Sequence, residues 1–159
     1  MSDEQADLQI ERGSPRDFLV VAALDRMAWP EEPDTFIPDG EHIWRVWSEH
    51  ATLLVAKVQS ATNLPQSHSI AGALVMFPTN DGGFFLHKIM VHPECRGRGI
   101  GTALMKHALR GADRPVLLTV DPANAAALQL YRGFGFEVRD EVTGYYRPHE
   151  DRSVMVFHP

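Results

Sequence analysis

The sequence predicts a mixed α/β domain in which antiparallel strands come first and helices then connect parallel strands. Three observations lead to this fold class. Apolar runs of strand length alternate with helical patterns along the 159 residues. A glycine-rich turn joins a buried strand directly to a helix, and such crossover helices accompany parallel strands. The length suits one domain over residues 1–159, with residues 1–6 as a flexible tail.

The first half of the chain contains two predicted helices among its strands. Leu8 and Ile10 alternate with polar residues, which is typical of a strand. Ser14 is the expected N-cap of the first helix, and Trp29-Pro30 is its expected stop. The predicted elements are a strand over Asp7–Arg12, helices over 14–28 and 41–49, and strands over 51–58 and 70–77.

The second half begins with a hairpin turn at residues 79–83 and then alternates strands with helices. Phe84–Val91 is rich in β-branched and aromatic residues, which predicts a buried strand. After the glycines, a helical spacing of apolar positions joins Ile100, Ala103, Leu104, His107 and Ala108. The remaining predicted elements are a strand over Val116–Val120, a helix over 123–131, and closing strands over 136–140 and 153–158.

The turn Arg96-Gly97-Arg98-Gly99-Ile100-Gly101 is the first candidate binding site. A glycine turn before a helix directs free backbone N–H groups and the positive end of the helix dipole at one point, which suits a phosphate or pyrophosphate. The dinucleotide fingerprint fails here because Thr102 stands at its third glycine, and the P-loop lysine is missing as well. An ordinary glycine turn at a strand–helix junction is the alternative.

Composition narrows the remaining classes of function. The net charge of −6 argues against a general nucleic-acid binder. The sequence has no membrane-length apolar window and its first residues are acidic and polar, so we expect no membrane partner and a cytoplasmic location. Cys95 is the only cysteine, and the histidines lack the spacing of metal ligands, so we expect neither a disulfide nor a metal.

Two motifs resemble those of a known superfamily. Arg96-x-x-Gly99-x-Gly101 after a strand resembles the acyl-CoA pyrophosphate loop of the GCN5-related N-acetyltransferase (GNAT) superfamily, whose pattern is Gln/Arg-x-x-Gly-x-Gly/Ala. Asn124-Ala-Ala-Ala-Leu-Gln-Leu-Tyr131-Arg-Gly-Phe-Gly-Phe136 resembles its Asn-x-x-Ala-x-x-Leu-Tyr-x-x-x-Gly-Phe segment. The element order is similar to that of the GNAT fold too, which implies a mixed sheet of about seven strands flanked by about four helices.

The resemblance implies an N-acetyltransferase that moves an acetyl group from acetyl-CoA, without a metal, to a primary amine by direct attack in a ternary complex. It places the pantetheine arm beside Met90, Val91 and His92, with Asn124 hydrogen-bonding the arm and a backbone N–H near Met90 meeting the oxyanion. The pyrophosphate would lie on Arg96, Gly97, Arg98, Gly99, Ile100, Gly101 and Thr102.

Two side chains are the candidate catalytic residues. Tyr131 shares a helix face with Asn124 and, with an ordinary pKa of about 10, stays protonated and able to protonate the departing thiolate. His87 is the candidate general base because the pKa of histidine lies near neutrality, and strand alternation puts it on one face with Ile89 and Val91. Alternatively, Tyr131 is only an aromatic residue of the core, and His87 is a structural histidine held by hydrogen bonds.

The resemblance leaves two kinds of acceptor open, a small amine and a protein N-terminus. In this superfamily the segment matching Trp29–Gly40 and the loop matching 141–152 select the acceptor. Gly144-Tyr145-Tyr146 through Met155 resembles the ending of N-terminal acetyltransferases, whereas Thr119 replaces the glutamate or histidine that these enzymes often carry. A homodimer is possible. The alternative function is an acyl-CoA-binding GNAT-fold module that transfers nothing.

Overall fold

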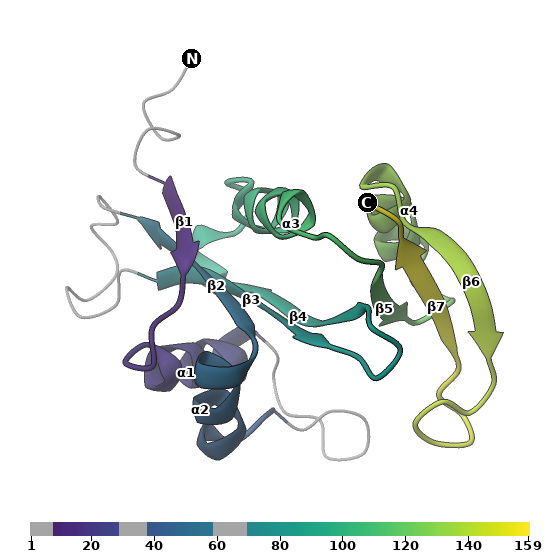
Figure 1. The fold of residues 1–159 in the computed structure, drawn as a ribbon, viewed down its shortest axis with the longest axis horizontal. Helices are drawn as coiled ribbons and strands as arrows, with labels where there is room; N and C mark the ends of the chain where they lie inside the picture. Colours follow the sequence, from purple (N-terminus) through teal and green to yellow (C-terminus); the bar gives the residue numbers. More distant parts are fainter. Residues whose placement is uncertain (1–7, 29–37, 59–69) are drawn as a thin grey trace. The chain divides into compact units, whose positions relative to one another are not determined.

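The computed structural model describes residues 8–28, 38–58 and 70–159, which form seven strands and four α-helices (Figure 1). The strands follow the order β1-β2-β3-β4-β5-β7-β6 in one mixed sheet, as the predicted fold class requires. The elements are β1 Leu8–Arg12, α1 Phe18–Ala28, α2 Glu41–His50, β2 Thr52–Val58, β3 Ile70–Pro78, β4 Phe84–Val91, the short 3₁₀-helix η2 Pro93–Cys95, α3 Ile100–Arg110, β5 Val116–Val120, α4 Ala125–Gly133, β6 Glu137–Val142 and β7 Arg152–Phe157.

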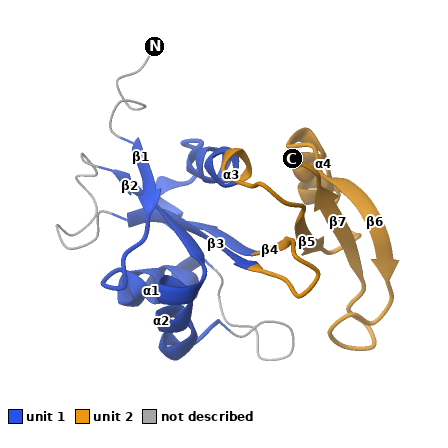
Figure 2. Cartoon of the chain, in the orientation of Figure 1, with its two compact units in different colours: residues 1–77, 87–108 blue, residues 78–86, 109–159 orange. Residues whose placement is uncertain are grey.

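The chain divides into two compact units, which Figure 2 colours separately. Unit 1 comprises residues 1–77 and 87–108, and unit 2 comprises residues 78–86 and 109–159. Strand β4 contributes its first three residues to unit 2 and the rest to unit 1. The two units are described separately below.

Unit 1 is built on antiparallel strands with helices on both faces. β1 pairs with β2, and β2 pairs with β3, both antiparallel. Helices α1 and α2 lie on one face of these strands and α3 lies on the other (Figure 1). Because both faces are covered, β3 is buried from Ile70 to Met76 instead of alternating. The core beneath α1 and α2 includes Val21, Leu24, Trp44, Val75 and Met90.

Helix α3 approaches the sheet closely at Gly72 in β3. A Cβ atom at this position would lie 2.9 Å from the backbone oxygen of Met90 and 2.9 Å from a methyl group of Ile100. Any larger residue would therefore push α3 and the end of β4 apart. Gly72 thus sets the distance between the first turn of α3 and the last residues of β4.

Unit 2 consists of the C-terminal strands and α4. β5 pairs in parallel with the start of β4, at Phe84 opposite Val116, and antiparallel with β7. β6 pairs antiparallel with β7, with a shift in register between Val138 and Asp140. Phe136 is buried, and its ring contacts those of Tyr131 in α4 and Phe157 in β7.

The structure confirms the predicted bounds of β4 and β5 and corrects those of two helices. The first helix begins at Phe18 instead of Ser14, because the Asp17 carboxylate accepts a hydrogen bond from the Ser14 N–H and holds residues 14–17 in a turn. The helix predicted from Ala123 begins at Ala125 because Asn124 is its N-cap.

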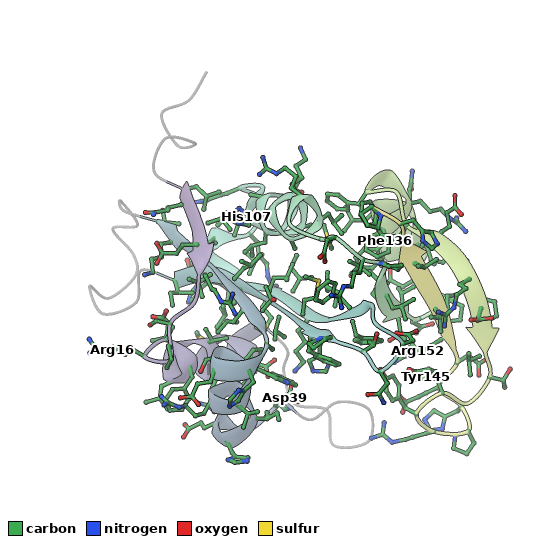
Figure 3. The ribbon with its side chains drawn as sticks, viewed as in Figure 1. Arg16, Asp39, His107, Phe136, Tyr145 and Arg152 are labelled. Carbon is green, nitrogen blue, oxygen red and sulfur yellow. The ribbon has the colours of Figure 1, made fainter. Side chains whose placement is uncertain are left out.

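Smaller corrections concern burial and the closing strands. His107, expected on the apolar side of its helix, is exposed on α3 (Figure 3). The last two strands are Glu137–Val142 and Arg152–Phe157, each displaced by one or two residues from the predicted bounds. The predicted tail at residues 1–6, the helix stop at Trp29-Pro30 and the loop at residues 59–69 lie outside the described residues.

Candidate active site

The glycine turn between β4 and α3 lies at the surface of unit 1. Gly97 and Gly99 have φ angles of 78° and 75°, in the left-handed region that favours glycine. A Cβ atom added to either residue would have no heavy atom within 4 Å, so the space around both glycines is open. Helix α3 begins at Ile100, so the unpaired N–H groups of its first turn open onto this exposed turn.

Two arginines flank these glycines. The Arg96 guanidinium donates to the backbone oxygen of Ala28 at the end of α1, at 3.3 Å between the two atoms. Arg98 is exposed between Gly97 and Gly99. The neighbouring Cys95 is buried, and this burial raises the pKa of its thiol although the charge of Arg98 opposes the shift. A protonated, buried thiol is a packing group rather than a nucleophile.

The end of β4 leads directly into this turn. Met90 is buried, while Val91 and His92 are partly exposed. The His92 N–H donates to the backbone oxygen of Ala71 at 2.7 Å, so this N–H is already used within the sheet. His92 Nδ1 accepts a hydrogen bond from the Glu94 N–H at 3.1 Å. The His92 side chain therefore serves as the cap of η2.

His87 stands earlier in β4 and contacts an aromatic and an acidic side chain. Its ring centroid lies 4.7 Å from that of Trp47 in α2. Its Nε2 lies 3.2 Å from an oxygen of Asp39, in the segment that precedes α2. Both side chains are partly exposed, that of His87 by 30% and that of Asp39 by 25%.

The predicted alternation along β4 does not extend to His87. Ile89 and Val91 lie beside Gly101 in α3, as alternation requires. His87 should share their face, yet it contacts Trp47 of α2, and the side chains of both His87 and Lys88 reach Asp39. Two consecutive side chains of one strand thus meet the same carboxylate, that of Asp39.

Asp39 belongs to a set of charged side chains that we call the Asp25 cluster, made of the buried Asp25, the largely buried Lys88 and the partly exposed Asp39. Lys88 Nζ lies 2.9 Å from one oxygen of Asp25 and 2.6 Å from an oxygen of Asp39. Asp25 also accepts hydrogen bonds from the Asp39 N–H at 3.0 Å and from the indole N–H of Trp44 at 3.2 Å. The Asp25 side chain is 0% exposed and that of Lys88 is 10% exposed.

The contacts of Asp39 change its acidity. Partial burial by itself would raise the pKa of the Asp39 carboxyl, but hydrogen bonds from His87 and Lys88, together with their charges, lower it below its ordinary value. Asp39 is therefore a carboxylate at neutral pH. It faces His87 as a hydrogen-bond acceptor and as a negative charge.

The other predicted site residues belong to unit 2. The Asn124 side-chain oxygen accepts a hydrogen bond from the Ala127 N–H at 3.1 Å, which caps α4. Asn124 is exposed, and its side-chain amide also carries an N–H₂ group that can donate hydrogen bonds. Tyr131 packs edge-to-face on Phe136, and burial raises the pKa of its phenol above the ordinary value. Tyr131 therefore carries its proton at neutral pH.

The loop between β6 and β7 carries the two remaining tyrosines. The rings of Tyr145 and Tyr146 meet edge-to-face at 4.8 Å, and both side chains are exposed. The Tyr146 hydroxyl lies 3.3 Å from that of Thr119 in β5. The Arg152 guanidinium covers the Tyr146 ring at 5.0 Å. Figure 3 labels Tyr145 and Arg152 at this end of the β6–β7 pair.

A comparison with protein-family models shows to which family the chain belongs. Residues 21–136 match the model of the acetyltransferase (GNAT) family. The chain belongs to this family. The match includes the glycine turn and the whole Asn124–Phe136 segment, so the family predicted from these two motifs is confirmed.

Two curated GNAT relatives match shorter stretches of the chain. An uncharacterized N-acetyltransferase of Methanocaldococcus jannaschii is 42% identical over 66 residues, which are 39% of this chain and 29% of the relative. The mycothiol acetyltransferase of Thermobifida fusca is 39% identical over 71 residues, 42% of this chain and 22% of the relative. The chain thus spans less than a third of the length of either relative.

Solved structures share the GNAT fold over nearly the whole chain. The ribosomal-protein-S18-alanine N-acetyltransferase from Escherichia coli has a TM-score of 0.73 at 22% identity and covers 95% of this chain and 93% of its own. NAA60 of Arabidopsis thaliana, in complex with acetyl-CoA, has a TM-score of 0.73 at 18% identity, with coverage of 96% and 99%.

Sequence reasoning missed the Asp25 cluster. Asp25 looks like an ordinary polar residue of an amphipathic helix, and Lys88 like an isolated charge in an apolar strand. A signal was present nonetheless, because a charged residue inside an otherwise apolar strand requires a partner. Which residues supply that partner depends on how α1 and the segment before α2 pack on β4.

Two features are absent from the described residues. No group of three or more His, Cys, Asp and Glu side chains in this part of the chain is arranged to hold a metal ion. None of the helices built from these residues is long and apolar enough to cross a membrane.

Proposed function

We propose that this GNAT-family chain is an acetyl-CoA-dependent N-acetyltransferase in which a primary amine attacks the thioester directly. The observation that carries the proposal is the junction of β4 and α3. There an exposed turn with two left-handed glycines, Gly97 and Gly99, precedes the open first turn of a helix. Such a junction binds phosphate groups through backbone N–H donors and the helix dipole.

The donor site follows from this junction. The pyrophosphate of CoA would lie on residues 96–102, with the exposed Arg98 adding positive charge. The pantetheine arm would lie along Met90 and Val91, whereas the His92 N–H is already bonded to Ala71. The side-chain amide of Asn124 is the proposed donor to the arm because its oxygen is used in capping α4.

The chemistry requires a base, an oxyanion donor and an acid. His87 is the proposed base, since it is partly exposed and contacts the Asp39 carboxylate. A backbone N–H near Met90 is the proposed oxyanion donor. Tyr131 is the proposed acid, and the raised pKa of its phenol keeps the proton available for the thiolate.

The acceptor is a small amine or a peptide N-terminus. The exposed Tyr145–Tyr146 pair and the fold shared with the S18-alanine N-acetyltransferase favour a peptide. Thr119 favours a small amine, because its hydroxyl contacts Tyr146 and supplies no base. Of the segment matching Trp29–Gly40, residues 29–37 lie outside the described residues. A cytoplasmic location and a homodimer stay predictions of the sequence.

Release of CoA thiol tests the function. Acetyl-CoA is supplied with polyamines, amino acids, arylalkylamines, aminoglycosides and short peptides with free N-termini, and we expect release with at least one of these classes. Binding of acetyl-CoA without release on any acceptor would favour the alternative, a module that binds acyl-CoA and transfers nothing. Tyr131→Phe should lower turnover at least about tenfold while acetyl-CoA still binds.

The donor site has its own matched pair of variants. Gly99→Ala places a Cβ on a residue with φ of 75°, which strains the turn by about 1–2 kcal/mol and should weaken acetyl-CoA binding. Gly82→Ala is the control, since it places a Cβ at an equally left-handed φ of 88° with open space around it, in the turn before β4 and outside residues 96–102. Equal binding by both variants, measured by calorimetry, would contradict the assigned pyrophosphate site.

A further inference from the structure

We propose that Asp39 is a positioning residue for His87, whose carboxylate fixes the Nε2–H tautomer so that Nδ1 carries the lone pair that accepts the proton of the acceptor amine. This inference rests on the proposed function, in which His87 is the base. The inference adds two things to that function: a residue that holds the base in place, and the identity of the ring nitrogen that accepts the proton.

The first observation is the contact itself. His87 Nε2 lies 3.2 Å from Asp39 Oδ2. A carboxylate accepts hydrogen bonds and donates none, so Nε2 must carry the hydrogen in this pair. The neutral imidazole then has its lone pair on Nδ1, for which no hydrogen bond to protein is found among the described residues. Nδ1 is therefore the ring atom left to accept a proton.

The second observation is that Asp39 is itself held in place at two points. Its backbone N–H donates to Asp25 at 3.0 Å, and its side-chain oxygen lies 2.6 Å from Lys88 Nζ. Asp25 is fully buried and also bonds Trp44 of α2. Asp39 is thus held directly by residues of α1 and β4, and α2 reaches it only through Asp25. A fixed acceptor holds the imidazole in one orientation.

The third observation concerns charge. The formal charges of Asp25, Asp39 and Lys88 sum to −1 (−1 −1 +1), and protonation of His87 brings the total to zero. The other side chains packed on the His87 ring, Trp47 from α2 and Phe77 from β3, are uncharged. The surroundings thus stabilise the imidazolium that forms during catalysis, as a carboxylate does for a histidine base.

The proton balance is simple. The acceptor enters as an ammonium ion and gives one proton to Nδ1 of His87. The resulting neutral amine uses its freed electron pair to attack the thioester carbonyl, and the tetrahedral intermediate breaks its C–S bond to expel CoA thiolate. Tyr131 gives its proton to the thiolate, and the second N–H proton of the former amine restores the Tyr131 phenol. The imidazolium keeps its Nε2–H bond to Asp39, and the proton on Nδ1 passes to water before the next turnover.

Asp39→Asn is the principal test, because asparagine keeps the shape and removes the charge. We expect kcat to fall about tenfold with KM for acetyl-CoA unchanged. We also expect the acid limb of the pH profile to move to lower pH, since loss of the carboxylate changes the charge of the cluster from −1 to zero and removes the charged acceptor of the Nε2–H bond, which disfavours the imidazolium. Nitrogen NMR of labelled histidine should report the Nε2–H tautomer for His87 in the unmodified protein and a mixture in the variant.

Glu41→Gln is the matched control. It removes the same charge two positions along the chain, from an exposed side chain that faces Arg26 at 3.9 Å. Its kinetics and pH profile should equal those of the unmodified protein. His87→Gln tests the base separately and should lower kcat by on the order of 100-fold. Thermal unfolding of each variant shows whether the fold is intact.

The outcomes separate the two proposals. No CoA release by the unmodified protein with any amine would overturn the proposed function. Full activity in His87→Gln would show that His87 is not the base, and it would overturn the role of Asp39 as well. A strong effect of His87→Gln beside an Asp39→Asn variant that behaves like Glu41→Gln would overturn the role of Asp39 alone. So would a lower kcat in Asp39→Asn with an unmoved acid limb and an unchanged tautomer.

Discussion

Asp25 in unit 1 and Glu150 in unit 2 are both buried carboxylates that meet basic side chains, yet their partners come from very different distances along the chain. Asp25 contacts Asp39, Trp44 and Lys88, which are 14, 19 and 63 residues away. Glu150 contacts Arg147, His149 and Arg152, all within three residues of it. One carboxylate joins three elements, and the other shapes a single loop.

Burial separates the two groups further. The Asp25 and Lys88 side chains are 0% and 10% exposed, so neither charge has water to replace a lost partner. The Glu150 side chain is 10% exposed, but its partner Arg147 is 39% exposed and reaches solvent. A buried pair becomes costly when one partner is removed, whereas a pair at the surface contributes little. Long-range partners and burial together make Asp25 the carboxylate that organises unit 1.

The largest expected effect comes from removing the positive charge of the Asp25 cluster. Lys88→Met should lower the free energy of unfolding by about 3–5 kcal/mol, because it leaves Asp25 as a buried charge without its ammonium partner. Urea denaturation measures the change. Lys57→Met is the control, since Lys57 pairs with Glu11 at the surface and its loss should cost less than about 1 kcal/mol. Equal losses would contradict the distinction between the two kinds of ion pair.

The next effect is the coupling within the Asp25 cluster. Asp25→Asn combined with Lys88→Met should cost less than the sum of the single variants, by about 1–3 kcal/mol, because the double variant no longer leaves a fully buried charge at position 25 without its ammonium partner. Unfolding free energies of the four proteins give this coupling directly. Additive costs would mean that the two side chains contribute to stability independently of each other.

Glu150→Gln should have a smaller effect. We expect a loss of about 1 kcal/mol in unfolding free energy, because the arginines around Glu150 remain hydrated. This loss should shrink in concentrated salt, which screens charges at a surface more than buried ones. Unfolding measured at low and high salt checks the prediction. A loss as large as that of Lys88→Met would place Glu150 in the same class as Asp25.

The smallest effect is the pH dependence contributed by Asp39. Its folded-state pKa is lowered, so its contribution to stability is present above the unfolded value of about 3.9 and is lost as the pH falls through the folded value. The difference in stability between the unmodified protein and Asp39→Asn should therefore be largest near neutrality and shrink below about pH 4. Denaturant curves at a series of pH values measure this difference in unfolding free energy. A difference that does not change with pH would contradict a stabilising role of ionised Asp39.

Local patterns predicted the parts of the site that depend on local geometry. The bounds of β4 and β5, the glycine turn and the start of α3 follow from runs of apolar residues and from glycines in left-handed conformations. The helix ends were predicted less well, because Asp17 and Asn124 use their side chains to bond nearby backbone groups, and the register of such bonds shifts a helix start by a few residues.

The sequence by itself determined the family, the order of the elements and the position of the glycine turn before α3, since each of these depends on residues that are close together in the chain. Only the tertiary structure decided that Asp25, Asp39 and Lys88 form one cluster and that His87 leaves the face of Ile89 to meet Asp39. The physical reason is burial. A charged side chain in a buried strand needs a partner of opposite charge. Which residue becomes that partner depends on how segments distant in the sequence pack together, and a local sequence pattern does not indicate this.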